Sequence, residues 1–400
     1  MASTEPSLTR ILIVLGGLAL LSPLALDAFL PAVNDAAVDL NTTIGQIMMS
    51  WGILSIGSGI GQIIHGPLSD RFGRKPIIIG SLITYFLTSI LSILVESLGP
   101  FYVLRFVQGF AMAATMILMR AVVRDLYSVR KGAKIFANLF VILAAVPVIA
   151  PIISGHLTTW FGWKAIFIMM ASISGIVLLI IVFFLDESLL KKDVQALNLN
   201  KLKSNFIEII SERNFITFLL IGVGAYIGLF AILTGIAPVM VGMLNQTAEN
   251  FGYQFGAIMT GHLIAAAFTG KLIEKFGIRK LLLIGISISL VGGISLFGIV
   301  ISNQITVISI LLPSTVYLVG FALTIPGMTA GALSNFQHMA GRATSLLGFI
   351  QQGTGAIVAV TLSFVADGSN AMPVALVLVV GSLFAFIAFV TKISKVVLQE

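Results

Sequence analysis

The sequence has no cysteine, few histidines and very little charge. The 400 residues include four histidines, and only 10% of the residues are charged. Without cysteine the chain forms no disulfide, thiolate nucleophile or cysteine-ligated metal site, and the four histidines do not cluster, so we expect no metal and no cofactor. Soluble domains carry roughly 25% charged residues. A chain with so little charge cannot cover a surface that faces water, so a soluble enzyme is nearly excluded.

Long apolar segments occupy most of the chain. Hydrophobic residues make up 58% of it, and a transmembrane helix needs about 20 apolar residues. Twelve such segments lie near 11–33, 44–68, 76–95, 98–123, 135–157, 163–185, 215–242, 253–273, 281–301, 305–333, 344–366 and 371–391. Asp27 interrupts the first segment and further spans follow it, which favours an uncleaved span over a signal peptide. The sequence predicts an all-α integral membrane protein with twelve transmembrane helices.

The basic residues are divided unequally between the two sides of the expected membrane. Of the 23 lysines and arginines, 20 fall on one side: Arg10, Arg71, Arg74, Lys75, Arg124, Arg130, Lys131, Lys134, Lys191, Lys192, Lys201, Lys203, Arg213, Lys271, Lys275, Arg279, Lys280, Arg342, Lys392 and Lys395. Lys164 is alone on the other side, and Arg105 and Arg120 lie within the fourth span. Because lysine and arginine favour cytoplasmic loops, we expect both termini in the cytoplasm. The net charge of +7 then reflects membrane anchoring, and we expect no nucleic-acid partner.

The longest break between spans divides them six and six. We expect an N-terminal six-helix bundle over residues 1–186, a cytoplasmic connector over 187–213 and a C-terminal six-helix bundle over 214–400. Apolar residues recur at helical spacing in the connector, which predicts an amphipathic helix on the cytoplasmic face. A plain connector is the simpler interpretation of this segment, and a regulatory segment is the alternative.

The two halves repeat one another. Residues 66–76 read GPLSDRFGRKP and residues 270–280 read GKLIEKFGIRK, an offset of 204 residues at which glycine, leucine, acid, base and phenylalanine recur in register. Pro31 near the end of the first span has a counterpart in Pro238 near the end of the seventh. Six-helix halves repeated in parallel are typical of a secondary transporter built from two bundles.

The 66–76 segment resembles the cytoplasmic signature between the second and third helices of the major facilitator superfamily. The resemblance implies that family's fold of two six-helix bundles. Physically, the segment suits a conformational latch: Gly66 allows close helix approach, Gly73 permits the turn, and Asp70 can face a cation. We expect Arg120 or Arg124 as that cation. Arg71 and Arg74 are assigned to the same latch, and we expect these bases to serve mostly as anchors to lipid phosphates.

Charge inside a span is costly and usually functional, and Arg105 and Asp27 are the candidates that this indicates. Arg105 begins the sequence RFVQG, which resembles the R-x-x-Q-G pattern of proton-coupled members of the superfamily. Asp27 is the one acidic residue well inside a span, and buried carboxyls can hold protons near neutral pH. We expect Arg105 to alter the proton affinity of a nearby carboxyl. The alternatives are an Arg105 that extends to the outer surface and an Asp27 that serves as a structural partner.

Two further stretches point to a branch of the superfamily. Residues 24–32, LALDAFLPA, resemble the first span of the drug-efflux branch named for bicyclomycin and chloramphenicol resistance, a group of proton-coupled antiporters. Residues 150–155, APIISG, resemble the fifth-helix antiporter pattern G-P-x-x-G-G, with Ala150 and Ser154 in place of two glycines. Pro151 and Gly155 remain, and a kinked, tightly packed helix there would keep a leak path closed.

The resemblance implies a proton-driven exporter of small amphipathic compounds that works by alternating access. Its partners would be a small-molecule substrate, protons and the lipid bilayer; we expect a monomer in a bacterial inner membrane. An ATP-driven pump is excluded because no P-loop is present. A carrier of one metabolite, such as a siderophore, sugar or amino acid, is the main alternative, and a passive channel or sensor is a second. Candidates to line the substrate cavity, or simply to pack the helices, are Asp27, Gln108, Met112, Tyr226, Phe230 and Gln351.

Overall fold

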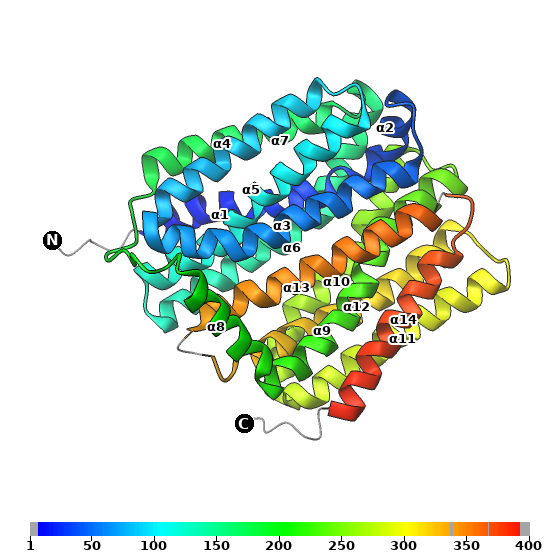
Figure 1. The fold of residues 1–400 in the computed structure, drawn as a ribbon. Helices are drawn as coiled ribbons and strands as arrows, with labels where there is room; N and C mark the ends of the chain where they lie inside the picture. The colour runs from blue at the N-terminus through cyan, green and yellow to red at the C-terminus, as the bar shows by residue number, and fades with distance from the viewer. Residues whose placement is uncertain (1–6, 337–338, 367, 393–400) are drawn as a thin grey trace.

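The protein is an assembly of long helices joined by short turns (Figure 1). The computed structural model describes residues 7–336, 339–366 and 368–392; Lys395 lies outside them. Over these residues the chain forms helices and no strand, and twelve helices are long and apolar enough to cross a membrane. The predicted all-α membrane fold with twelve spans is confirmed.

For description we call α1–α7 the N-terminal half and α9–α14 the C-terminal half. The N-terminal half comprises α1 (Leu8–Asp27), η1 (Leu30–Ala32), α2 (Val33–Asp39), α3 (Ile44–Phe72), α4 (Arg74–Ile93), α5 (Leu98–Leu126), α6 (Val129–Phe161) and α7 (Ala165–Phe184). After α8 (Leu199–Ser211), the C-terminal half comprises α9 (Arg213–Ala237), the π-helix η2 (Pro238–Met243), α10 (Ala248–Phe276), α11 (Ile278–Ile301), α12 (Val307–Leu333), α13 (Ala340–Val365) and α14 (Met372–Lys392). In Figure 1 the two halves lie side by side, with α8 running across one end.

The ends of the spans follow local sequence signals. Gly73 has φ +113°, which ends α3 and lets α4 begin at the next residue, because glycine tolerates positive φ without steric cost. Gly277 has φ +74° at the equivalent place between α10 and α11, so the predicted repeat appears as the same turn in both halves. Thr43 begins α3 with a capping box that includes Gln46.

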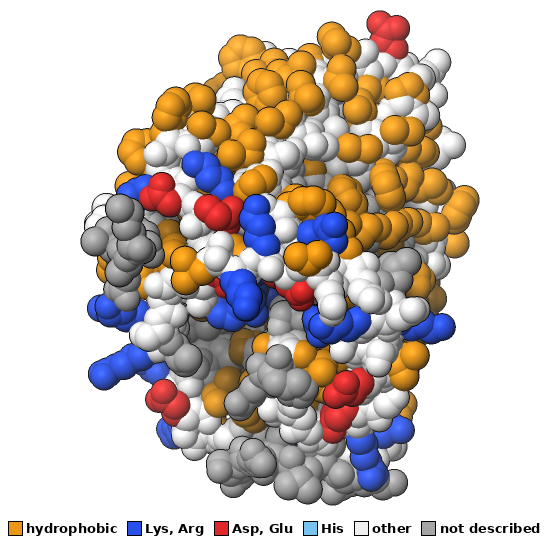
Figure 2. Space-filling model, turned by 60° about the vertical axis from the view of Figure 1, so that its left-hand side comes forward, with side chains coloured by type: hydrophobic (Ala, Val, Ile, Leu, Met, Phe, Trp, Pro, Cys, Tyr) orange, Lys and Arg blue, Asp and Glu red, His pale blue; other side chains and the backbone are white. Residues whose placement is uncertain are grey.

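The helix bundle has two ends, which we name by what they carry. The terminal face carries the start of α1, the end of α14, α8 and the turn between α3 and α4, and the far face carries α2 and the turn between α6 and α7 (Figure 1). Lysine and arginine side chains gather on the terminal face (Figure 2). On the far face, Lys164 lies 3.4 Å from Asp39. The basic side chains therefore collect at one end of the spans, as the sequence predicts.

The two halves meet mainly where α3 packs against α13 and α6 packs against α10. Backbones approach closely at glycines: a Cβ added at Gly155 would lie 2.6 Å from the Ala248 carbonyl, and one at Gly252 would lie 2.4 Å from the Pro151 carbonyl. Pro151 and Gly155 thus lie at a tight contact between the halves. This contact closes the α6–α10 side near the far face.

Candidate functional site

The first span is broken at Asp27. Helix α1 ends there, and Pro31, at the second position of η1, has no amide hydrogen to bond the carbonyl of Asp27 four residues earlier. The last carbonyls of a helix need other donors. Two side chains from neighbouring helices supply them: Arg105 of α5 donates from Nη2 to the Ala25 carbonyl at 3.0 Å, and Trp51 of α3 donates from Nε1 to the Leu26 carbonyl at 3.0 Å.

The carboxyl of Asp27 is buried and has no partner. The residue is 5% exposed, and the structure shows no hydrogen bond or ion pair from its side chain to any other described residue. An unpaired carboxylate in an apolar interior costs a large free energy of desolvation. A single proton removes that charge. Burial without a partner is therefore the arrangement expected of a group that binds and releases a proton, rather than of a structural ion pair.

Arg105 is completely buried beside this break. Its Nη1 donates to Gln108 Oε1 at 2.7 Å, and Gln108 Nε2 donates to Ser89 Oγ at 3.0 Å. The Nε of Arg105 has no acceptor among the described residues. The guanidinium lies over the rings of Phe29 at 5.4 Å and Phe167 at 6.0 Å, within the range of cation–π attraction.

Arg105 and Asp27 do not form an ion pair in this structure, although they meet the same helix end. The carbonyl that accepts from Arg105 belongs to Ala25, two residues before Asp27. The guanidinium interacts favourably there because a helix C-terminus carries partial negative charge. The alternative of an Arg105 that extends to the outer surface does not hold in this structure, because the side chain is fully enclosed.

Several residues expected to line a cavity are instead packed. Gln108 and Met112 are both fully buried, and Gln108 is hydrogen-bonded to Arg105 and Ser89, so in this conformation neither faces an open cavity. Phe230 is 3% exposed. Tyr226 and Gln351 are half-buried and retain some accessible surface.

A row of aromatic rings crosses between the halves, and the sequence predicted a functional place for only two of its members, Tyr226 and Phe230. Trp51 of α3 contacts Phe230 of α9 with ring centroids 5.2 Å apart; Phe230 contacts Tyr226 at 5.7 Å; Tyr226 contacts Phe321 of α12 at 5.2 Å; and Phe321 contacts His262 of α10 at 5.8 Å. A signal for Trp51 was present: tryptophan in membrane proteins favours the interfaces, whereas Trp51 lies within an apolar span.

The signature segment 66–76 is held by a buried arginine. Arg74, 3% exposed, donates from Nη1 to Asp70 Oδ1 at 2.5 Å and from Nε to Asp125 Oδ2 at 2.9 Å, and its Nη1 also donates to Ser69 Oγ at 2.6 Å. The predicted pairing of Asp70 with Arg120 or Arg124 is wrong for this structure. The turn at Gly73 places Arg74, four residues after Asp70, within ion-pair distance of the Asp70 carboxylate.

The segment after α7 forms hydrogen bonds to the turn at Gly73. Glu187 accepts from the backbone amides of Arg74 at 2.9 Å and Lys75 at 3.2 Å, which satisfies the first orphan donors of α4. Arg71 donates to the Val194 carbonyl at 2.7 Å, and Asp193 donates its amide to the Asp70 carbonyl at 2.9 Å. Arg71 and Arg74 therefore make protein contacts, and the interpretation of Arg74 as a lipid anchor is corrected.

Two other residues of the expected latch, Gly66 and Arg124, lie towards α13. Arg124 is exposed, and its Nη1 lies 3.3 Å from the position of a Cβ on Gly341. Gly66 lies opposite Ser345, whose Oγ is 3.7 Å from the position of a Cβ on Gly66. Arg120 is exposed on α5, one turn before Arg124. Gly66 and Arg124 face the boundary between the halves, while the Arg74 network lies inside the N-terminal half.

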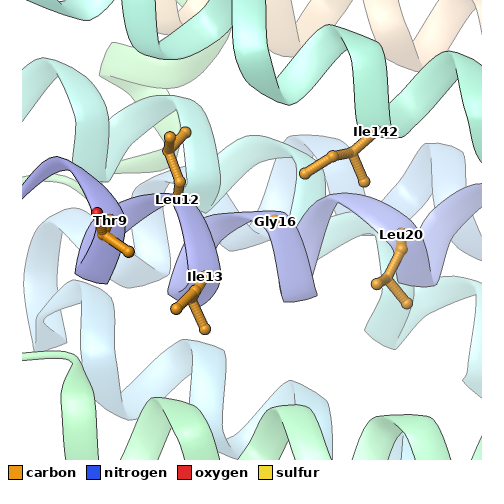
Figure 3. Close-up of a pocket in the computed structure, with 6 residues that line it drawn as sticks. All are labelled: Thr9, Leu12, Ile13, Gly16, Leu20 and Ile142. Atoms are coloured by element: carbon orange, nitrogen blue, oxygen red, sulfur yellow. The ribbon is translucent and has the colours of Figure 1, made fainter.

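An apolar groove of about 380 Å³ runs along α1 (Figure 3). It is lined by Thr9, Leu12, Ile13, Gly16, Leu20 and Ile142. Leu20 precedes Asp27 by seven residues, which is roughly 10 Å of helical rise. None of the residues that line the groove is ionisable, so the groove itself offers no group that could bind a proton.

Comparison with known proteins agrees with this architecture. Residues 15–360 match the model of the Major Facilitator Superfamily. The chain is 29% identical to a bicyclomycin resistance protein homolog of Haemophilus influenzae, over 87% of each chain. It is 28% identical to a chloramphenicol resistance protein of Pseudomonas aeruginosa, over 85% of this chain and 80% of that one.

A solved D-xylose-proton symporter has the same fold, with a TM-score of 0.76 and 16% identity over 98% of this chain and 99% of that one. The likeness at this identity concerns the fold alone. The twelve spans and the match over most of the chain make this a multi-pass membrane transporter and not an enzyme. The chain belongs to the major facilitator superfamily.

Proposed function

We propose that the protein exports small amphipathic compounds in exchange for protons. The observation that carries the proposal is Asp27, a buried carboxyl without a partner at a broken helix end. Relatives named for bicyclomycin, chloramphenicol and multidrug resistance support a drug-like substrate class. The largely apolar interior of the molecule suits such compounds, because apolar walls with a few ionisable groups bind amphipathic ligands.

The cycle is alternating access. Residues 1–186 and 214–400 act as two rocking bundles, joined by the connector 187–213. The basic terminal face is cytoplasmic, in line with the positive-inside rule, and the membrane is a bacterial inner membrane. When the far face opens, Asp27 takes a proton from outside and substrate leaves. When the terminal face opens, substrate from the cytoplasm competes with that proton and displaces it.

Arg105 adjusts the proton affinity of Asp27. The guanidinium is attached to the same last turn of α1 through the Ala25 carbonyl. Any shift of that turn changes the distance between Arg105 and Asp27, and a cation favours the ionised carboxylate more strongly as it comes closer. Movement of α1 thereby changes the proton affinity of Asp27.

The signature segment acts as the conformational latch of the terminal face. Gly66, Asp70, Arg71, Gly73 and Arg74 form one rigid corner of the N-terminal half, because the buried Arg74 joins α3, α4 and α5 through two carboxylates. Arg120 and Arg124 extend from that corner, Arg124 towards α13. In this arrangement the corner moves as a unit when the halves separate, and the contacts of the two exposed arginines are the ones that change.

The test uses purified protein in liposomes with an internal pH dye and an imposed proton gradient. Amphenicols, bicyclomycin-like peptides, quaternary ammonium dyes and siderophores are added in turn. Wild type should release protons with at least one compound, and Asp27→Asn should not. Asp35→Asn is the matched control, because Asp35 lies nearby on α2 but is half-exposed; it should behave as wild type. Equal proton movement in wild type and Asp27→Asn would refute the role of Asp27.

The alternative is export of one metabolite on the same scaffold. It predicts that a single compound in the panel, such as a siderophore, drives proton movement and that the drugs neither drive nor compete with it. A broad response among the amphipathic compounds supports the multidrug proposal instead. The protein is expected to work as a monomer, so proton movement per molecule should not depend on protein density in the liposomes.

A further inference from the structure

Trp51 makes two contacts through one fully buried side chain, one to α1 and one to α9. Its indole Nε1 donates to the Leu26 carbonyl at 3.0 Å, and its ring meets Phe230 at a centroid distance of 5.2 Å and an angle of 67°. Leu26 is the residue directly before Asp27. Phe230 belongs to α9 in the other half of the molecule. The Trp51 side chain therefore contacts both the end of α1 next to Asp27 and α9 of the C-terminal half.

Both ends of this bridge are tightly packed. A Cβ added at Gly355 of α13 would lie 2.5 Å from the Phe230 ring, so the ring has no room to move towards α13. Gly52, next to Trp51, lies against Ala359 of α13, whose Cβ would be 3.1 Å from a Cβ on Gly52. In a close-packed interior a shift of one group displaces its neighbours instead of being absorbed. A movement of the Leu26 carbonyl is therefore passed to the contact between the halves.

We infer that Trp51 is a positioning residue that couples the protonation of Asp27 to the contact between the two halves. The inference rests on the proposed role of Asp27 as proton carrier. Gain or loss of the proton changes the free energy of the α1 break, and the turn that ends at Asp27 relaxes. When the Leu26 carbonyl moves, the hydrogen-bonded indole moves with it, and the contact between the indole and the Phe230 ring becomes tighter or looser. Trp51 itself binds neither proton nor substrate in this scheme.

A tyrosine on α4 provides a matched control. Tyr85 is also fully buried and donates its hydroxyl to an α1 carbonyl, that of Leu21, at 3.4 Å. Leu21 lies five residues before Leu26, and α4 packs within the N-terminal half against α5 and α7. Tyr85→Phe therefore removes a donor to α1 without touching the partner half.

The first experiment separates the two edges of Trp51 in the liposome assay. Trp51→Phe retains an aromatic ring but removes the N–H donor, and Phe230→Leu retains the donor but removes the ring that it reaches. Trp51→Phe should lower substrate-driven proton release by about fivefold, the factor that loss of one hydrogen bond of ordinary strength produces. Phe230→Leu should also lower it, because the ring contact at 5.2 Å is lost. Substrate affinity at fixed pH should change by less than about twofold in Trp51→Phe, because in this scheme Trp51 makes no substrate contact. Tyr85→Phe should match wild type in both readouts.

The second experiment reports on the contact between the halves directly. Because the chain has no cysteine, Ser363→Cys introduces a single label site where α13 lies against Gly45 of α3 at the far face. Maleimide labelling of this variant is divided at each pH by that of the unfolded protein, which removes the intrinsic pH dependence of the thiolate; the labelling corrected in this way should change with pH. The pH dependence should vanish when either Trp51→Phe or Asp27→Asn is added, and it should persist with Tyr85→Phe.

The possible results separate this inference from the proposed function. If Asp27→Asn moves protons like wild type, the proposed function itself fails. If Asp27→Asn is inactive while Trp51→Phe and Phe230→Leu retain wild-type proton release and pH-dependent labelling, only the coupling inference is overturned. Loss of coupling in both bridge variants, with unchanged substrate affinity in Trp51→Phe and an unaffected tyrosine control, supports it. If Trp51→Phe does not fold, Phe230→Leu alone decides between these results.

Discussion

Replacing Gly109 with alanine should force α3 and α5 apart. A Cβ added at Gly109 would lie 2.0 Å from the Leu54 carbonyl oxygen, whereas ordinary van der Waals contact begins at 3.4 Å. The obstacle is backbone, which cannot rotate away as a flexible side chain would. Overpacking of this kind costs about 1–3 kcal/mol. At the opposite position of the same contact, a Cβ on Gly57 would lie 2.1 Å from the Phe106 carbonyl oxygen, so neither helix can yield alone.

The assay is thermal unfolding of the purified protein in detergent, with Gly80→Ala as the control. Gly80 lies in the middle of α4 with nothing within 4 Å of its added Cβ, so that change should be neutral or should stabilise the helix by up to about 1 kcal/mol. Gly109→Ala should lower Tm by several degrees relative to Gly80→Ala. It should also reduce transport, because α3 carries Trp51 and α5 carries Arg105, and both side chains must reach the end of α1. Equal Tm values for the two variants would refute the reasoning.

Three further changes test separate parts of the structure. Asp125→Asn removes a charge partner of the buried Arg74 and should lower Tm markedly, since breaking a buried ion pair costs up to about 3–5 kcal/mol. Its control is Asp186→Asn, which breaks an exposed ion pair and should leave Tm within the scatter of wild type. Arg105→Lys should abolish transport in liposomes without a comparable loss of Tm, because an ammonium cannot reproduce the two divergent hydrogen bonds of the guanidinium; retained transport would contradict that role. His156→Phe removes a hydrogen bond from α6 to α10 and should increase maleimide labelling of a cysteine introduced at the far face, and unchanged labelling would show that this contact does not hold the halves together.

Much of the candidate site was visible in the sequence because it depends on single residues in an apolar context. Asp27 and Arg105 stand out in spans that otherwise lack charge, and Pro31 marks the place where the first helix cannot continue. The turn at Gly73 and its repeat at Gly277 follow from the glycines and the register of the two halves. Each of these features is local, so no knowledge of neighbouring helices was needed to identify it.

The partners of these residues were not predictable in the same way. Asp70 was assigned to Arg120 or Arg124, but the structure pairs it with Arg74 and adds Asp125 from α5. Which cation reaches a carboxylate depends on how three helices are rotated about their axes. Gln108 was expected in a cavity but faces Arg105 and Ser89. The spacing of residues along one helix does not determine which side of that helix meets its neighbours.

The sequence by itself determined the number of spans, the unequal distribution of charge and the places where helices end. It did so because a bilayer requires each spanning segment to satisfy its own backbone hydrogen bonds and to be apolar over its length, conditions that a single segment meets or fails alone. Only the tertiary structure decided that Asp27 lacks a partner, that Arg105 and Trp51 supply donors to the carbonyls before it, and that Trp51 reaches Phe230 across the boundary. Those contacts join residues on different helices, and their geometry exists only once the helices have packed.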